Sequence, residues 1–149
     1  MQPLNTKKLH IALGQALQDI KYCKARPHKY EINMGDWVKF NHRCAVCLAG
    51  AVMVRRGLVT RADADGEGRL VDVFDNLARP KKVTRRTQRM LHALDRLRLG
   101  FVDDALWYIK SKRKRGIPPD RLVPDSTGAN DEWLKAMRAL QKELEAANL

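Results

Sequence analysis

An unbroken apolar run, Cys44–Val54, must be buried in whatever structure this chain adopts. The run is shorter than the roughly 18 residues of a membrane-spanning helix, so we expect no membrane span. Arg55 and Arg56 follow the run and Gly57 comes next, an order typical of a helix C-terminus. The sequence therefore predicts a buried central helix over the run, ended by these three residues.

Helical periodicity predicts a first helix upstream of this run. Asn5 or Thr6 is a suitable cap, and the helix should reach about Lys24, because Pro27 disfavours helical geometry at the residue before it. Between the two helices, residues 30–33 are predicted to form a short extended piece. One face of the first helix carries the apolar residues Leu9, Leu13, Ala16, Leu17 and Ile20.

Three further helices are predicted, over residues 84–99, 103–115 and 131–147, and residues 70–74 are read as a strand or the start of a short helix. The last helix follows a loop at 117–130 that is rich in Pro and Gly. Its apolar seam either docks on the domain or pairs with a second copy in a homodimer. The apolar stripes are Met90, Leu91, Leu94 and Leu97 in the first of these helices and Trp133, Met137, Leu140 and Leu144 in the last.

Together these elements predict a mainly α fold. We expect a compact bundle of about four to five helices, with a possible short β element and a C-terminal amphipathic helix after the Pro-rich loop. The predicted organisation is a helical basic domain over 1–116, a loop over 117–130 and a C-terminal helix over 131–147.

A surplus of positive charge is the clearest functional signal. The chain has 149 residues, with 29 Lys and Arg against 17 Asp and Glu, for a formal net charge of +12. Dense basic blocks stand at 79–86 and 110–115, and a helix over 84–99 places three arginines within an arc of roughly 40°. Such a surface attracts polyanions, although solvated helix ends are the plainer interpretation of each block. The candidate nucleic-acid-binding residues are Lys81, Lys82, Arg85, Arg86, Arg89, Arg96, Lys112, Arg113, Lys114 and Arg115.

Catalytic signatures are lacking. The sequence contains no Walker loop, no nucleophile elbow and no His-Glu-x-x-His motif, so we expect neither an enzyme nor a bound cofactor. The pair Cys44 and Cys47 is best interpreted as core packing, with a redox dithiol as the weaker alternative. A zinc site with Cys23 and His28 is a further alternative, but one Cys-x-x-Cys pair does not justify predicting a metal.

The segment Trp37–Met53, with its pattern Trp-x6-Cys-x2-Cys-Leu-Ala-Gly-Ala-Val-Met, resembles a segment of small uncharacterised bacteriophage proteins. The resemblance covers about 17 residues. It implies a phage or prophage setting, a cytoplasmic location in the host cell and action by binding.

Three binding functions fit the charge. The first is nucleic-acid binding through the Lys/Arg surface. The second is inhibition of a host or defence protein through contact with an acidic patch. The third is a sponge that sequesters a nucleotide messenger in a basic pocket. We favour the first.

Overall fold

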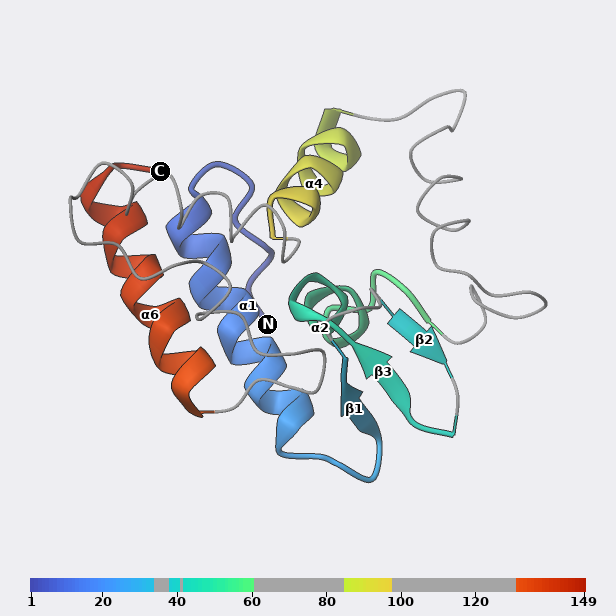
Figure 1. Cartoon of the computed structure of the whole chain (residues 1–149). Helices are drawn as coiled ribbons and strands as arrows, with labels where there is room; N and C mark the ends of the chain where they lie inside the picture. The colour runs from blue at the N-terminus through green and yellow to red at the C-terminus, as the bar shows by residue number, and fades with distance from the viewer. Residues whose placement is uncertain (34–37, 41, 61–84, 98–130) are drawn as a thin grey trace.

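The computed structural model describes residues 1–33, 38–40, 42–60, 85–97 and 131–149 (Figure 1). Predictions for residues 70–74, 103–115 and 117–130 therefore lie outside the described residues. Among the described residues, no helix combines the length and the apolar character that crossing a bilayer requires. The described elements are α1 (Leu9–Lys24), β1 (Tyr30–Ile32), β2 (Val38–Phe40), β3 (Cys44–Val46), α2 (Leu48–Arg55), α4 (Arg85–Arg96) and α6 (Asp131–Ala146).

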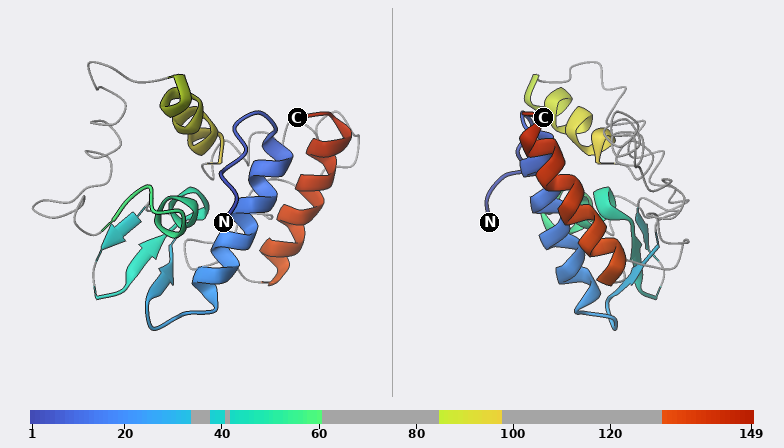
Figure 2. Two further views of the ribbon diagram at one scale, coloured as in Figure 1. Left: turned by 180° about the vertical axis from the view of Figure 1, so that it is seen from behind. Right: turned by 60° about the vertical axis from the view of Figure 1, so that its left-hand side comes forward.

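Helix α1 is the centre of the structure, with α6 along one side and α2 along the other (Figures 1 and 2). Its predicted apolar face is buried, and the predicted end at Lys24 is confirmed. The side chain of Asn5 accepts hydrogen bonds from the backbone N–H groups of Lys7 and Lys8, at 2.9 and 2.8 Å. Asn5 therefore orders the turn before the helix. The predicted cap at Asn5 or Thr6 is wrong, because the helix begins at Leu9 and its N-cap is Lys8, whose side chain forms no capping hydrogen bond.

A three-stranded mixed sheet follows, in the order β1-β3-β2. Strand β1 is parallel to β3, with Tyr30 opposite Cys44, and β2 is antiparallel to β3, with Phe40 also opposite Cys44. The short extended piece predicted at 30–33 is confirmed as β1. All three residues of the central strand β3 are buried, because it has a strand on each side and α2 packs against the sheet.

The predicted mainly α bundle is wrong, because the described part of the chain contains this mixed sheet beside four helices. The predicted continuous helix over Cys44–Val54 is also wrong. Its first three residues form β3, and the helix α2 begins at Leu48. A central strand is buried on both faces, so its sequence is as uniformly apolar as that of a buried helix and periodicity does not separate the two.

Local hydrogen bonds set both ends of α2. At its start, the sulfur of Cys47 accepts a hydrogen bond from the backbone N–H of Gly50 at 3.4 Å. At its end, Gly57 has a φ of 67°, and Leu58 N–H donates to the Met53 carbonyl at 2.8 Å. This is a helix end of the Schellman type, which requires the left-handed conformation that glycine adopts most easily. The predicted end of the helix at Gly57 is confirmed.

Helix α6 lies antiparallel to α1. Lys24, at the end of α1, approaches Asp131, at the start of α6, with 3.6 Å between Nζ and Oδ1. At the other end, Leu9 N–H donates to the backbone oxygen of Leu149 at 2.6 Å. The apolar seam of α6 is therefore buried within the same chain in this structure. Pairing of the seam with a second copy stays a prediction. Its buried members are Trp133, Leu134, Met137, Leu140 and Leu144.

Candidate functional site

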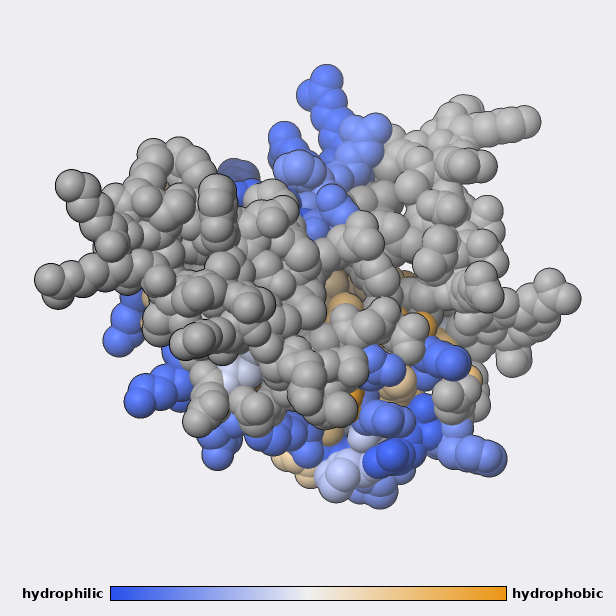
Figure 3. All heavy atoms as spheres, viewed as in Figure 1, coloured by the Kyte–Doolittle hydropathy of each residue, from blue (hydrophilic) through white to orange (hydrophobic). Residues whose placement is uncertain are grey.

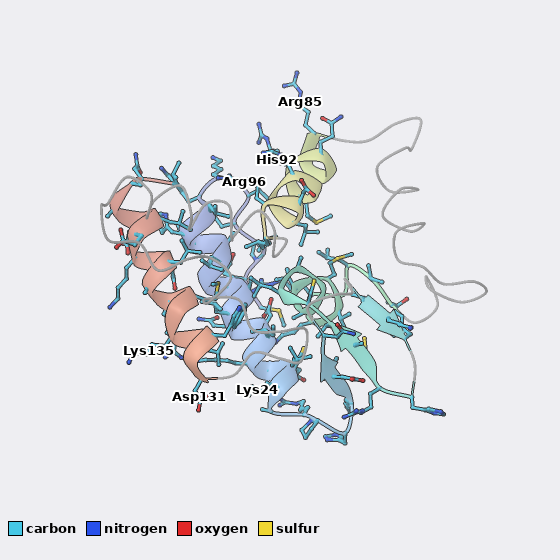
Figure 4. All side chains as sticks on the ribbon, viewed as in Figure 1. Lys24, Arg85, His92, Arg96, Asp131 and Lys135 are labelled. Carbon is cyan, nitrogen blue, oxygen red and sulfur yellow. The ribbon has the colours of Figure 1, made fainter. Side chains whose placement is uncertain are left out.

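Helix α4 carries three arginines and one histidine on one side. Arg85, Arg89, His92 and Arg96 are spaced four, three and four residues apart. At 100° per residue they fall within an arc of about 60°. Figure 4 shows Arg85, His92 and Arg96 along the same side of the helix, and Figure 3 shows hydrophilic side chains projecting there. We call Arg85, Arg89 and Arg96 the α4 arginine face.

The other side of α4 attaches the helix to the core. Leu94 and Leu97 are buried, and Met90 is partly buried against the same cluster. This stripe lies on the far side of the helix from the arginine face. Packing therefore holds α4 in place and leaves Arg85, Arg89 and His92 exposed, while Arg96 is half-buried near Thr6 and Lys8.

Two members of the α4 arginine face have no acidic partner in the part of the chain that the structure describes. Among the described residues, no carboxylate forms an ion pair with Arg85 or Arg89. Both side chains are exposed, and no described carboxylate balances their positive charges. Such groups are suited to bidentate contact with phosphate or carboxylate oxygens.

A cavity of about 750 Å³ lies beside this face, between the N-terminal segment, the end of α2 and α4. Arg55 and Arg56 reach it from α2, and Arg89 reaches it from α4. No acidic residue is among the described residues that line the cavity. Its apolar lining includes Leu4, Leu58 and Met90.

A buried carboxylate holds the two arginines from α2. Asp19 of α1 is fully buried. It accepts a hydrogen bond from Arg55 Nη1 at 2.8 Å and another from Arg56 Nε at 2.7 Å. Arg56 also donates to the backbone oxygen of Gln2. The guanidinium carbon of Arg55 lies 4.3 Å from the centre of the Tyr22 ring, within the range of a cation–π contact.

One carboxylate serves two guanidinium groups, so this cluster keeps one surplus positive charge. The side chain of Arg56 is only 9% exposed and that of Arg55 is 25% exposed. A charge in such surroundings is poorly solvated, and its field is less screened than that of a fully exposed side chain. The described residues that line the cavity therefore carry a net positive charge.

The structure places only part of the predicted site. It brings Arg85, Arg89 and Arg96 together on α4, with Arg86 on the same helix but its side chain outside the described set. The remaining candidates lie outside the described residues: Lys81, Lys82, Lys112, Arg113, Lys114 and Arg115.

Sequence reasoning missed the cluster of Asp19, Arg55 and Arg56, because it treated the two arginines only as helix-end signals. The sequence contains one feature that could have pointed to this cluster. Asp19 stands three residues after Ala16 and four before Cys23, so an acid lies at the edge of an apolar helix face. A buried acid requires a cationic or hydrogen-bonding partner.

The three cysteines are buried in the core and form no disulfide, which confirms core packing for Cys44 and Cys47. Burial, with smaller contributions from nearby Cys44 and Asp19, raises the pKa of Cys23 to about 12. Within the described ranges, no three His, Cys, Asp or Glu side chains gather as metal ligands. His28 is exposed, whereas the three thiols are buried. The zinc alternative with Cys23, His28, Cys44 and Cys47 therefore receives no support.

The raised pKa of Cys23 leads to a prediction about alkaline pH. The folded state holds the thiol proton up to about pH 12, whereas the ordinary thiol pKa is 9.0. Between these values the folded state binds more protons than the unfolded state, so the Cys23 contribution to stability is lost as the pH rises. We expect urea unfolding to show that Cys23→Ala loses less stability than the wild type between pH 9 and pH 11. Equal losses in the two proteins would contradict the prediction.

Comparison of the chain with models of protein families, with curated proteins and with solved structures finds no significant match. The resemblance of residues 37–53 to phage proteins, and the location in a host cell that it implies, therefore stay predictions.

Proposed function

We propose that the protein binds nucleic acid through the α4 arginine face. The observation that supports this function is the arrangement of Arg85, Arg89 and Arg96 on one side of a packed helix, where Arg85 and Arg89 have no acidic partner among the described residues. The net charge of +12 adds long-range attraction to a polyanion.

The dimensions of α4 suit a nucleic-acid groove or backbone. Arg85 and Arg96 are about 16 Å apart along the helix axis, at 1.5 Å per residue. A helix is about 10–12 Å across with its side chains, and the major groove of DNA is about 12 Å wide. Arginines spaced along one side of such a helix can neutralise several phosphates. Contacts of this kind position a protein on the backbone without reading its sequence.

The test is fluorescence anisotropy with a labelled duplex and a labelled single strand, over a series of salt concentrations. We expect the affinity to fall steeply with salt. Arg85→Gln should lower the slope of log K against log salt by about 1, and Arg85→Gln with Arg89→Gln should lower it by about 2, because each substitution removes one phosphate contact.

The matched control is Lys135→Gln with Arg138→Gln. It removes the same charge from exposed positions on α6, away from the α4 arginine face. We expect its salt slope to stay close to that of the wild type. An equal loss in the control would show that only the total charge matters, and no binding to either probe at about 50 mM salt would refute the proposal.

The alternative of an inhibitor that binds an acidic protein stays a prediction, since no feature of the described residues favours it over nucleic acid. The absence of catalytic activity also stays a prediction. Sequestration of a nucleotide messenger also stays a prediction.

A further inference from the structure

We propose that the cavity lined by Arg55, Arg56 and Arg89 is a binding site for a nucleoside phosphate. Its volume of about 750 Å³ is within the range of about 300–1,000 Å³ that is usual for small-molecule sites. The proposal rests on the charge, the fixed donors and the apolar lining of this cavity. It holds whether or not the α4 arginine face binds nucleic acid.

The positive charge of the described lining favours a negatively charged ligand. Asp19 balances only one of the two guanidinium groups that it holds, and Arg89 adds a further positive charge at the rim. No acidic residue is among the described residues of the lining. An uncompensated charge in a poorly solvated place destabilises a protein, so a bound anion would relieve that cost.

The donors are fixed before a ligand arrives. Asp19 holds Arg55 and Arg56 through hydrogen bonds of 2.8 and 2.7 Å, and the ring of Tyr22 lies 4.3 Å from the Arg55 guanidinium carbon. Each guanidinium has five N–H donors, so the contacts with Asp19 leave further donors for a ligand. Because these side chains are already ordered, binding costs less conformational entropy than recruitment of mobile arginines would. Fixed guanidinium groups suit the oxygens of a phosphate group.

The apolar part of the lining favours a phosphate that carries an apolar or aromatic group. Leu4, Leu58 and Met90 are partly buried hydrophobic residues that also contact the core, so they form a stable apolar wall. A flat base can pack on such a wall, and the methionine sulfur of Met90 is a favourable neighbour for an aromatic ring. A phosphate attached to a nucleoside therefore fits this cavity better than inorganic phosphate does.

Two sources supply this chemistry: a free mononucleotide and the phosphorylated end of a nucleic-acid strand. Arg89 belongs to the cavity and to the α4 arginine face, so a strand end in the cavity would continue along α4.

Isothermal titration calorimetry of the full chain tests the proposal, with AMP, GMP, CMP and UMP titrated separately. We expect at least one nucleotide to bind about ten- to hundredfold more tightly than its nucleoside and than inorganic phosphate. The nucleoside lacks the charge-assisted hydrogen bonds to the phosphate, and inorganic phosphate lacks the apolar contacts of the base. Arg89→Gln should weaken the nucleotide about tenfold. Thermal melting should show that this variant is folded, because Arg89 is exposed and has no acidic partner among the described residues.

Arg85→Gln is the matched control. Arg85 lies on the same helix but is not among the cavity residues, so its loss should leave the nucleotide affinity unchanged while it weakens the duplex. The experiment can therefore refute nucleotide binding in the cavity without refuting nucleic-acid binding by the α4 arginine face, and the reverse. Two strands that differ only at the 5′ end, one with a phosphate and one with a hydroxyl, distinguish the two sources. If the protein prefers the 5′-phosphate strand and Arg89→Gln abolishes that preference, the ligand is a strand end. If the protein binds a nucleotide tightly but shows no preference for the 5′-phosphate strand, the ligand is a free nucleotide. No binding of any nucleotide at millimolar concentration, or equal affinity for nucleotide and nucleoside, would overturn the proposal.

Discussion

Asp19→Asn is expected to lower the free energy of unfolding by about 3–5 kcal/mol. The substitution keeps the size of the side chain and removes its charge. Arg55 and Arg56 would then share a partly buried place with no counter-charge in the cluster, and an unpaired charge in such surroundings is costly. A loss of this size is a large part of the roughly 5–15 kcal/mol that stabilises a typical domain.

Urea unfolding followed by circular dichroism measures this effect. Asp131→Asn is the matched control, because Asp131 is fully exposed and its contact with Lys24 is 3.6 Å long. An exposed ion pair contributes about 0–1 kcal/mol, so the control should stay close to the wild type. If the free energy of unfolding fell by the same small amount in both variants, Asp19 would not be the residue that joins α1 to the end of α2.

Trp133→Ala is expected to lower the free energy of unfolding by about 3–5 kcal/mol, because it removes the largest buried side chain among the described residues of α6 and leaves a cavity in the core. The substitution tests whether α6 is part of the core of the same chain. Lys135→Ala, on an exposed position of the same helix, should change stability by no more than about 0.5 kcal/mol.

The same unfolding experiment separates docking within the chain from pairing between chains. If α6 docks on α1 of its own chain, the unfolding midpoint of the wild type is independent of protein concentration. A midpoint that rises with concentration, together with a small effect of Trp133→Ala at low concentration, would show that the seam is formed between two copies.

The predictable parts of the fold are those in which a helix has one apolar side. The buried face of α1 and the apolar stripes of α4 and α6 were all evident from a spacing of three and four residues. The arginine spacing on α4 followed from the same periodicity. Glycine at the end of α2 was also informative, because few other residues adopt a φ of 67° at low cost.

The boundary between β3 and α2 was not predictable from hydrophobicity. The run Cys44–Val54 has no polar residue to reveal a period, and a buried strand and a buried helix both tolerate that composition. Pairing with neighbouring strands makes Cys44–Val46 a strand instead of the start of the helix. β1 and β2 supply partners for Cys44–Val46 on both sides, and the sulfur of Cys47 then caps the helix that follows.

The sequence by itself determined where apolar helix faces and surplus cations lie along the chain, since both are local and repeat with the geometry of a helix. Only the tertiary structure decided that Asp19 meets Arg55 and Arg56, 36 and 37 residues away, and that Arg89 faces the same cavity. Contacts between distant segments depend on how elements pack in three dimensions, and a single sequence carries no periodic signal for that packing.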